Sequence, residues 1–213
     1  REMERALELD PRSPIVRTLH ALVEMPHGRI EEARMDLMSA LESDPLNSLT
    51  RGWLVLMLCL GRQYDRAIEE AQALIALDPA SFLGHFTAGF PYREKRLFPE
   101  AITAHRRAVE LSGGFPLMLG WLGLALGQAG EAAEARAILE RLHVIAAQHY
   151  VPPTNFAWIH LALGETDDAF TWMERAVDNG DLMIIPIKTY PFLDPLRDDP
   201  RFLTLLRKMN LAT

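Results

Sequence analysis

Residues 48–81 read SLTRGWLVLMLCLGRQYDRAIEEAQALIALDPAS, and this stretch decides the fold. Its first thirteen residues are apolar at helical spacing, and Gly61 then begins a predicted turn. In the second half, apolar residues recur three and four apart while Glu69 and Glu70 face water, which indicates an amphipathic helix. Pro79 ends this helix because proline cannot continue one. The stretch therefore predicts a hairpin of two helices.

The hairpin recurs with a period of thirty-four residues. Two helices can approach closely only where neither side chain is bulky, so columns of small residues at this period predict helix crossings. The columns are Ala33, Ala67, Ala101, Ala135 and Ala169, and Ala21, Val55, Gly89, Gly123 and Ala157, with hairpin ends at Pro11, Pro45 and Pro79. The expected organisation is the second helix of a truncated leading repeat (1–13), five hairpins (14–47, 48–81, 82–115, 116–149 and 150–178), and a C-terminal extension (179–213).

The period breaks at the turn-forming residues 178–181, and the apolar run 182–185 after them fits either a short helix or an extended strip. Asp199, followed by Pro200, predicts the start of a last helix. The apolar stripe of this helix is Phe202, Leu205, Leu206 and Met209. We expect it to cover the last hairpin, because the end unit of a solenoid otherwise leaves apolar surface in water.

The repeat columns resemble those of the tetratricopeptide repeat (TPR) family over residues 1–178. The resemblance implies an all-α, right-handed superhelical solenoid of helix hairpins with a C-terminal capping helix. The chain departs from the family pattern where Arg17 and Arg51 replace an aromatic residue and Gly113 replaces a proline. Because no proline ends the second helix of 116–149, we expect a distorted junction between His143 and Pro153.

The string FLDPLRDDPRF at residues 192–202 resembles the closing signature of a bacterial group of TPR domains. In that group the repeats follow signalling or DNA-binding modules, among them winged-helix regulators, class III adenylate cyclases and serine/threonine kinases. The resemblance implies a regulatory or partner-binding region whose effector domain lies upstream of Arg1. It implies the cytoplasm, with the periplasm as the alternative.

Composition and charge exclude several functions. Apolar residues make up 49% of the chain and charged residues 24%, which is enough for a packed core. The net charge of −7 argues against binding to nucleic acid, which needs clustered Lys and Arg. The longest apolar run, Trp53 to Leu60, is too short to span a membrane. The single cysteine, Cys59, lies inside this run and is expected to be a core thiol.

No residue pattern indicates an enzyme, a metal site or a cofactor. His20 and His105 occupy columns that hold packing residues in other hairpins, and no cysteine or carboxylate stands at ligand spacing from His143, His149 or His160. Neighbouring glutamates on a helix point in different directions, and no nucleophile motif or phosphate-binding loop is present. We expect the glycines of residues 120–127 to serve close helix packing.

A ligand is expected on the concave side, which the first helices of the hairpins line. Aromatic side chains there can anchor a peptide and an arginine can meet a carboxylate, although the same side chains can equally pack between neighbouring hairpins. The candidate partner-binding residues are Leu49, Leu56, Phe86, Phe90, Arg93, Leu117, Leu124 and Trp158.

Two functions remain open at this stage. The first is a non-catalytic domain that binds a protein or peptide partner, with no nucleic acid and no membrane involved. The alternative is self-association, in which apolar end surfaces or the run 182–185 form a homodimer and bring two attached effector domains together.

Overall fold

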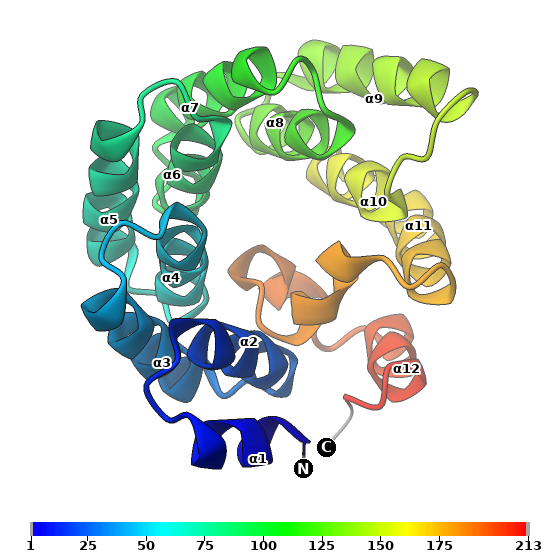
Figure 1. The fold of residues 1–213 in the computed structure, drawn as a ribbon. Helices are drawn as coiled ribbons and strands as arrows, with labels where there is room; N and C mark the ends of the chain where they lie inside the picture. Colours follow the sequence, from blue (N-terminus) through cyan, green and yellow to red (C-terminus); the bar gives the residue numbers. More distant parts are fainter. Residues whose placement is uncertain (1, 212–213) are drawn as a thin grey trace.

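The computed structural model describes residues 2–211, and every regular element in this part of the chain is helical (Figure 1). Arg1, Ala212 and Thr213, which the expected ranges 1–13 and 179–213 include, lie outside the described residues. A leading helix, α1 (Glu2–Leu9), precedes five hairpins. The hairpins are α2 (Pro14–Glu24) with α3 (Ile30–Ser43), α4 (Ser48–Leu60) with α5 (Tyr64–Leu77), α6 (Phe82–Glu94) with α7 (Phe98–Leu111), α8 (Pro116–Gln128) with α9 (Ala132–Ala146), and α10 (Pro153–Ala162) with α11 (Thr166–Asp178).

The hairpins stack side by side into a curved array, so that the first helices lie inside the curve and the second helices outside it (Figure 1). This arrangement confirms the predicted all-α solenoid of helix hairpins. Chain curvature follows from the small rotation between successive units, which leaves a concave side.

Burial confirms that the small-residue columns mark helix crossings. All five alanines from Ala33 to Ala169 are buried completely. At Gly123 of α8, an added β-carbon would lie 2.5 Å from the Ile159 side chain of α10, so a larger residue here would force Ile159 to move. Gly120 and Gly127 meet α10 in the same way, and close helix packing therefore explains these glycines.

The two arginines that depart from the family pattern make repeated contacts. Arg17 donates a hydrogen bond to the Pro11 carbonyl oxygen at 2.7 Å and pairs with Asp36. Arg51, one period later, donates to the Pro45 carbonyl oxygen at 3.0 Å and pairs with Glu70. Each arginine therefore ties the start of its hairpin to the second helix of the same hairpin.

The irregular positions lie near the two ends of the array. A short 3₁₀ helix, η1 (Met25–His27), follows α2 and ends at Gly28, whose φ of 78° favours glycine. At the junction between His143 and Pro153, α9 continues through His143 to Ala146 and residues 147–152 form a loop. α10 has only 10 residues, whereas α8, the first helix before it, has 13. The expected distortion at this junction is present.

The last part of the chain turns back into the concave side. After α11 come two 3₁₀ helices, η2 (Leu182–Lys188) and η3 (Pro191–Leu196), which lie inside the curve in Figure 1. We call residues 182–196 the concave insert. The run 182–185 is thus a short helix, one of the two forms that the sequence allowed.

The final helix, α12 (Pro200–Lys208), packs on α11 as expected. The Asp199 side chain accepts a hydrogen bond from the Arg201 backbone N–H and caps α12. Phe202, Leu205 and Leu206 are buried. The Arg201 guanidinium lies 4.1 Å from the centre of the Phe170 ring of α11, so α12 covers the last hairpin.

Candidate functional site

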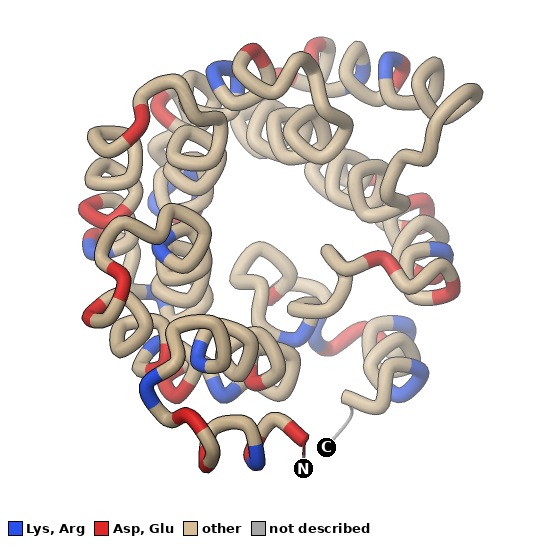
Figure 2. The backbone as a smooth tube through the Cα atoms, in the orientation of Figure 1, with Lys and Arg blue, Asp and Glu red and all other residues tan. Residues whose placement is uncertain are grey.

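The concave face is almost free of charge in its second half. Helices α8 and α10 contain no Lys, Arg, Asp or Glu, and Figure 2 shows both as uncoloured tube while charges follow the outer helices. α6 contributes one charged pair, Arg93 and Glu94. Such a surface favours contact with apolar and aromatic side chains.

Aromatic side chains from the first helices and from the concave insert meet at the centre of this face. We call Phe86, Phe90, Trp121, Trp158, Tyr190 and Phe192 the aromatic cluster. The Tyr190 ring centre lies 5.8 Å from that of Trp121 and 5.9 Å from that of Trp158. The Phe192 ring centre lies 6.0 Å and 5.2 Å from the same two indoles. Edge-to-face geometry, which aromatic pairs prefer, holds in all four contacts.

Arg93 is the charged member of the site. Its guanidinium carbon lies 4.6 Å from the centre of the Phe192 ring and 5.4 Å from that of Trp121. It also pairs with Glu94 at 2.6 Å. Burial lowers the pKa of Arg93 and raises the pKa of Glu94, and each charge opposes the effect on the other. The aromatic rings and Glu94 together compensate a guanidinium that is only 4% exposed.

Polar contacts at three points hold the concave insert in place. At its start, the Asp181 carboxylate accepts hydrogen bonds from the backbone N–H and the hydroxyl of Thr154, at 3.0 Å and 2.7 Å. Near its end, Arg62 pairs with Asp194 at 2.5 Å. Arg197 donates to the carbonyl oxygens of Lys188 and Tyr190, at 2.5 Å and 3.5 Å. Contacts between η1 and η2 bring the insert to the first hairpin as well.

The insert leaves buried polar groups without a partner. Trp121 Nε1, Trp158 Nε1 and Arg93 Nε are buried and have no hydrogen-bond acceptor among residues 2–211. All three are donors only. The cavity beside Trp121 and Arg93, which Leu56, Phe90 and Tyr190 help to line, has a volume of about 10 Å³, room for at most one water molecule.

The structure brings together about half of the predicted site residues. Phe86, Phe90, Arg93 and Trp158 belong to the aromatic cluster or contact it, and Leu56 lines the cavity next to it. Leu124 is buried and Leu117 half-buried, whereas Leu49 is 59% exposed at the start of α4. Phe90, Arg93, Leu124 and Trp158 are almost fully buried, beneath or around the insert.

Several residues of the site were missed by sequence reasoning. Trp121 could have been found, because it stands two periods after Trp53 in a column of the first helices. Tyr190, Phe192 and Asp194 carry no such signal, since the insert lies outside the repeats and nothing in its local pattern says where it folds.

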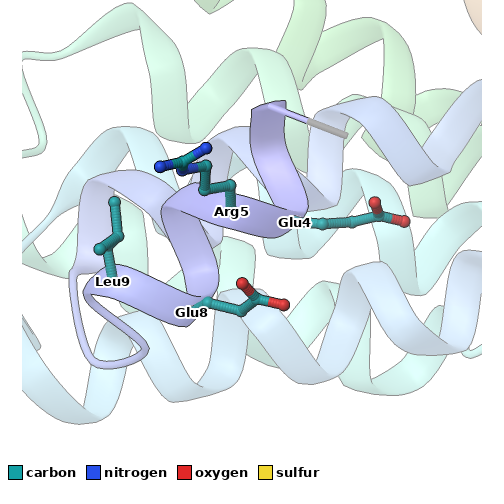
Figure 3. A pocket seen from close by; sticks show the side chains of 4 residues that line it. All are labelled: Glu4, Arg5, Glu8 and Leu9. Carbon is teal, nitrogen blue, oxygen red and sulfur yellow. The ribbon is translucent and has the colours of Figure 1, made fainter.

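His105 and Cys59 are core residues, and another hollow of the described chain lies on α1. His105 is packed between aromatic rings and completely buried, and burial lowers its pKa to about 3, so it is a neutral core residue as predicted. Cys59 is buried as expected, and burial raises the pKa of its thiol. The hollow in Figure 3 is lined by Glu4, Arg5, Glu8 and Leu9, all from one exposed helix, α1, which gives it no enclosing wall.

One expectation about metal ligands was wrong. His160, Glu165 and Asp168 have ligand atoms within 4.8 Å of one another, although the sequence indicated no carboxylate near His160. The turn between α10 and α11 brings them together. Arg136 already pairs with Glu165 at 2.7 Å, and its positive charge opposes binding of a cation there.

Comparison with known proteins shows the fold. No protein-family model and no curated protein matches the chain. Among solved structures, a thermophilic TPR protein from Thermus thermophilus, TTC0263, is similar at a TM-score of 0.65 and 17% identity, covering 85% of this chain and 99% of that one. PilW, a type IV pilus biogenesis factor, reaches 0.62 at 17% identity, covering 87% and 86%. YrrB, a TPR protein with an unusual peptide-binding site, reaches 0.51 at 17% identity, covering 88% and 97%. The chain has a TPR-type fold.

No helix among residues 2–211 is both long enough and apolar enough to cross a membrane.

Proposed function

We propose that the chain is a non-catalytic protein-interaction domain of a bacterial regulatory or signalling protein, and that its concave face binds a peptide. One observation carries the proposal: the aromatic cluster already holds a peptide segment, Tyr190 to Phe192, between two indoles and an arginine. A surface with this chemistry has the rigid aromatic anchors that dominate binding energy at protein interfaces. The TPR-type fold adds support, since YrrB bears a peptide-binding site.

The regulatory setting comes from the closing signature FLDPLRDDPRF rather than from the geometry. In this proposal an effector domain lies upstream in the same protein, and the domain works in the cytoplasm.

Selection of peptides from a random display library on the intact chain tests the binding role. We expect the selected peptides to share a motif, and Phe86→Ala to weaken their binding about tenfold because Phe86 is a half-exposed member of the cluster. Val144→Ala is the matched control, since Val144 is 71% exposed on α9, outside the curve. Circular dichroism verifies that helix content is unchanged. Failure to select any peptide, or equal binding by Phe86→Ala and wild type, contradicts the proposal.

Self-association is the second candidate, and an exposed apolar stripe on α2 favours it. Ile15, Leu19 and Val23 stand four residues apart and are 72%, 47% and 44% exposed. The other surface considered for a homodimer, residues 182–185, is largely occupied within the chain, since Ile184 is buried. Sedimentation velocity up to high concentration decides between these roles, and a persistent monomer removes self-association.

A further inference from the structure

The segment Tyr190–Asp194, of sequence YPFLD, occupies the concave face in the manner of a bound peptide. Its two aromatic rings sit between Trp121 and Trp158, which belong to different hairpins. Pro191 between them is buried. The segment enters 3₁₀ helix η3 at Pro191, and it is contacted by side chains from several hairpins, as a ligand on a TPR-type concave surface is.

Two arginines contact the same segment at defined positions. Arg93 stacks on the Phe192 ring, and Arg62 binds the Asp194 carboxylate two residues later. A planar guanidinium suits both kinds of contact. The site therefore selects two aromatic residues separated by one residue, followed by a carboxylate.

The segment is an incomplete match to the surface beneath it. The N–H groups of Trp121, Trp158 and Arg93 Nε stay buried without an acceptor among the described residues. Leaving such a donor unpaired is unfavourable. A peptide that supplies carbonyl or carboxylate oxygens at this point satisfies groups that the insert does not.

Contacts outside the YPFLD segment also hold the chain on both sides of it. Asp181 holds its start at Thr154 of α10, and α12 beyond its end packs on α11. The segment can thus leave the aromatic cluster while the solenoid keeps its cap.

We propose that Tyr190–Asp194 is a ligand bound in cis, an inference that rests on the proposed peptide-binding function. The partner is then a peptide of the same chemistry that replaces this segment. The pattern required is aromatic, proline, aromatic, apolar, then Asp or Glu, because Pro191 and Leu193 are buried together with the two rings. Because the cis segment is tethered, its effective concentration at the site is high, and it weakens binding of every competing peptide.

The test uses a fluorescently labelled peptide of residues 188–196, KTYPFLDPL, in anisotropy titrations. The intact wild-type chain is compared with the intact double variant Tyr190→Ser/Phe192→Ser, in which the cis segment no longer competes. We expect the double variant to bind the peptide on the order of 100-fold more tightly than wild type. A control peptide with serine at both aromatic positions should bind neither protein. Asparagine in place of the peptide's aspartate should weaken binding about two- to fivefold, because the Arg62–Asp194 pair is partly exposed.

Amide hydrogen exchange on wild type gives a readout that does not depend on the variant folding. The proposal requires the amides of Tyr190, Phe192, Leu193 and Asp194 to exchange much faster than those of α8 and α10, because the segment opens locally. Equal protection of the segment and these helices overturns it, as does a folded double variant that binds no KTYPFLDPL peptide. Display-selected peptides that bind wild type and the double variant equally leave the proposed function standing and refute the cis-ligand assignment.

Discussion

The first and the last hairpins place the same sequence columns in opposite surroundings. Ile15, Leu19 and Val23 of α2 are 72%, 47% and 44% exposed. Four periods later, Val151 in the loop before α10 is 7% exposed, and Asn155 and Ile159 of α10 are both 0% exposed. The difference lies in the neighbour, because α8 packs against this face of α10, and no first helix precedes α2 among residues 2–211. Position in the stack, rather than residue type, sets the burial of a repeated column.

The two helices also begin differently. The hydroxyl of Ser13, directly before α2, accepts a hydrogen bond from the Val16 N–H. Pro152 before α10 has no side chain to do this, and Asp181 supplies the cap from 27 residues downstream of Thr154. The first turn of the last hairpin therefore depends on Asp181, the residue directly before the concave insert, whereas the first turn of α2 is capped by local sequence.

The largest expected effect on the free energy of unfolding comes from a substitution at buried Ile159, which occupies the same repeat position as exposed Val23. Ile159→Ala should lower the free energy of unfolding by about 3 kcal/mol, because it opens a cavity against Gly123 of α8. Val23→Ala, in the same column of α2, should change it by less than about 0.5 kcal/mol. Urea unfolding followed by circular dichroism measures both. Similar losses in the two variants would show that the loss of unfolding free energy depends on the position within the repeat and not on the helix packed against it.

Removal of the downstream cap should have the next largest effect. Asp181→Ala deletes the acceptor for Thr154 and for the Met183 N–H, and we expect a loss of about 2 to 3 kcal/mol. Ser13→Ala, the local cap of α2, should cost at most about 1 kcal/mol. Hydrogen exchange should show faster opening of the insert in Asp181→Ala alone. An insert that stays protected in this variant would contradict the role of Asp181 as its anchor.

Buried His105, in the middle hairpin of the array, should make the free energy of unfolding depend on pH. Burial holds the pKa of His105 near 3 instead of 6.5. Between these values the unfolded chain binds a proton that the folded chain excludes, so folding loses stability as pH falls. His105→Leu removes this loss. Lowering the pH from 7 to 5 should therefore decrease the free energy of unfolding of wild type by about 2 kcal/mol more than that of His105→Leu.

Urea midpoints at several pH values measure the effect of His105→Leu. Met173→Leu is the control, because Met173 is equally buried in the same column and does not titrate. An identical pH dependence in wild type and His105→Leu would show that the pKa of His105 is the same in the folded and the unfolded chain.

The smallest expected effect on stability concerns the open face of α2. The double variant Ile15→Ser/Leu19→Ser should change the free energy of unfolding by less than about 0.5 kcal/mol, since both side chains are exposed. If the chain self-associates through this stripe, the same variant should become monomeric in sedimentation velocity. Self-association that survives in the variant would assign the contact to another surface.

The sequence predicted the hairpins well because each rests on local signals repeated five times. Pro45 and Pro79 end helices by removing a backbone donor, and Ala67 or Gly123 marks a crossing because nothing larger fits. The site was predicted only in part. Phe86, Phe90, Arg93 and Trp158 were identified from their phase on the first helices, whereas their burial by Tyr190 and Phe192 was not foreseen.

The sequence by itself determined the helices, their pairing in hairpins and the covering of the last hairpin by the final helix. These features depend on periodicity, turn residues and apolar stripes within short stretches. Only the tertiary structure decided the state of the concave face. The insert follows no period, and its position is set by contacts with residues far away in sequence, such as Arg62 with Asp194 and Trp121 with Tyr190. Long-range contacts of this kind depend on which surfaces the folded solenoid presents, and no local pattern encodes them.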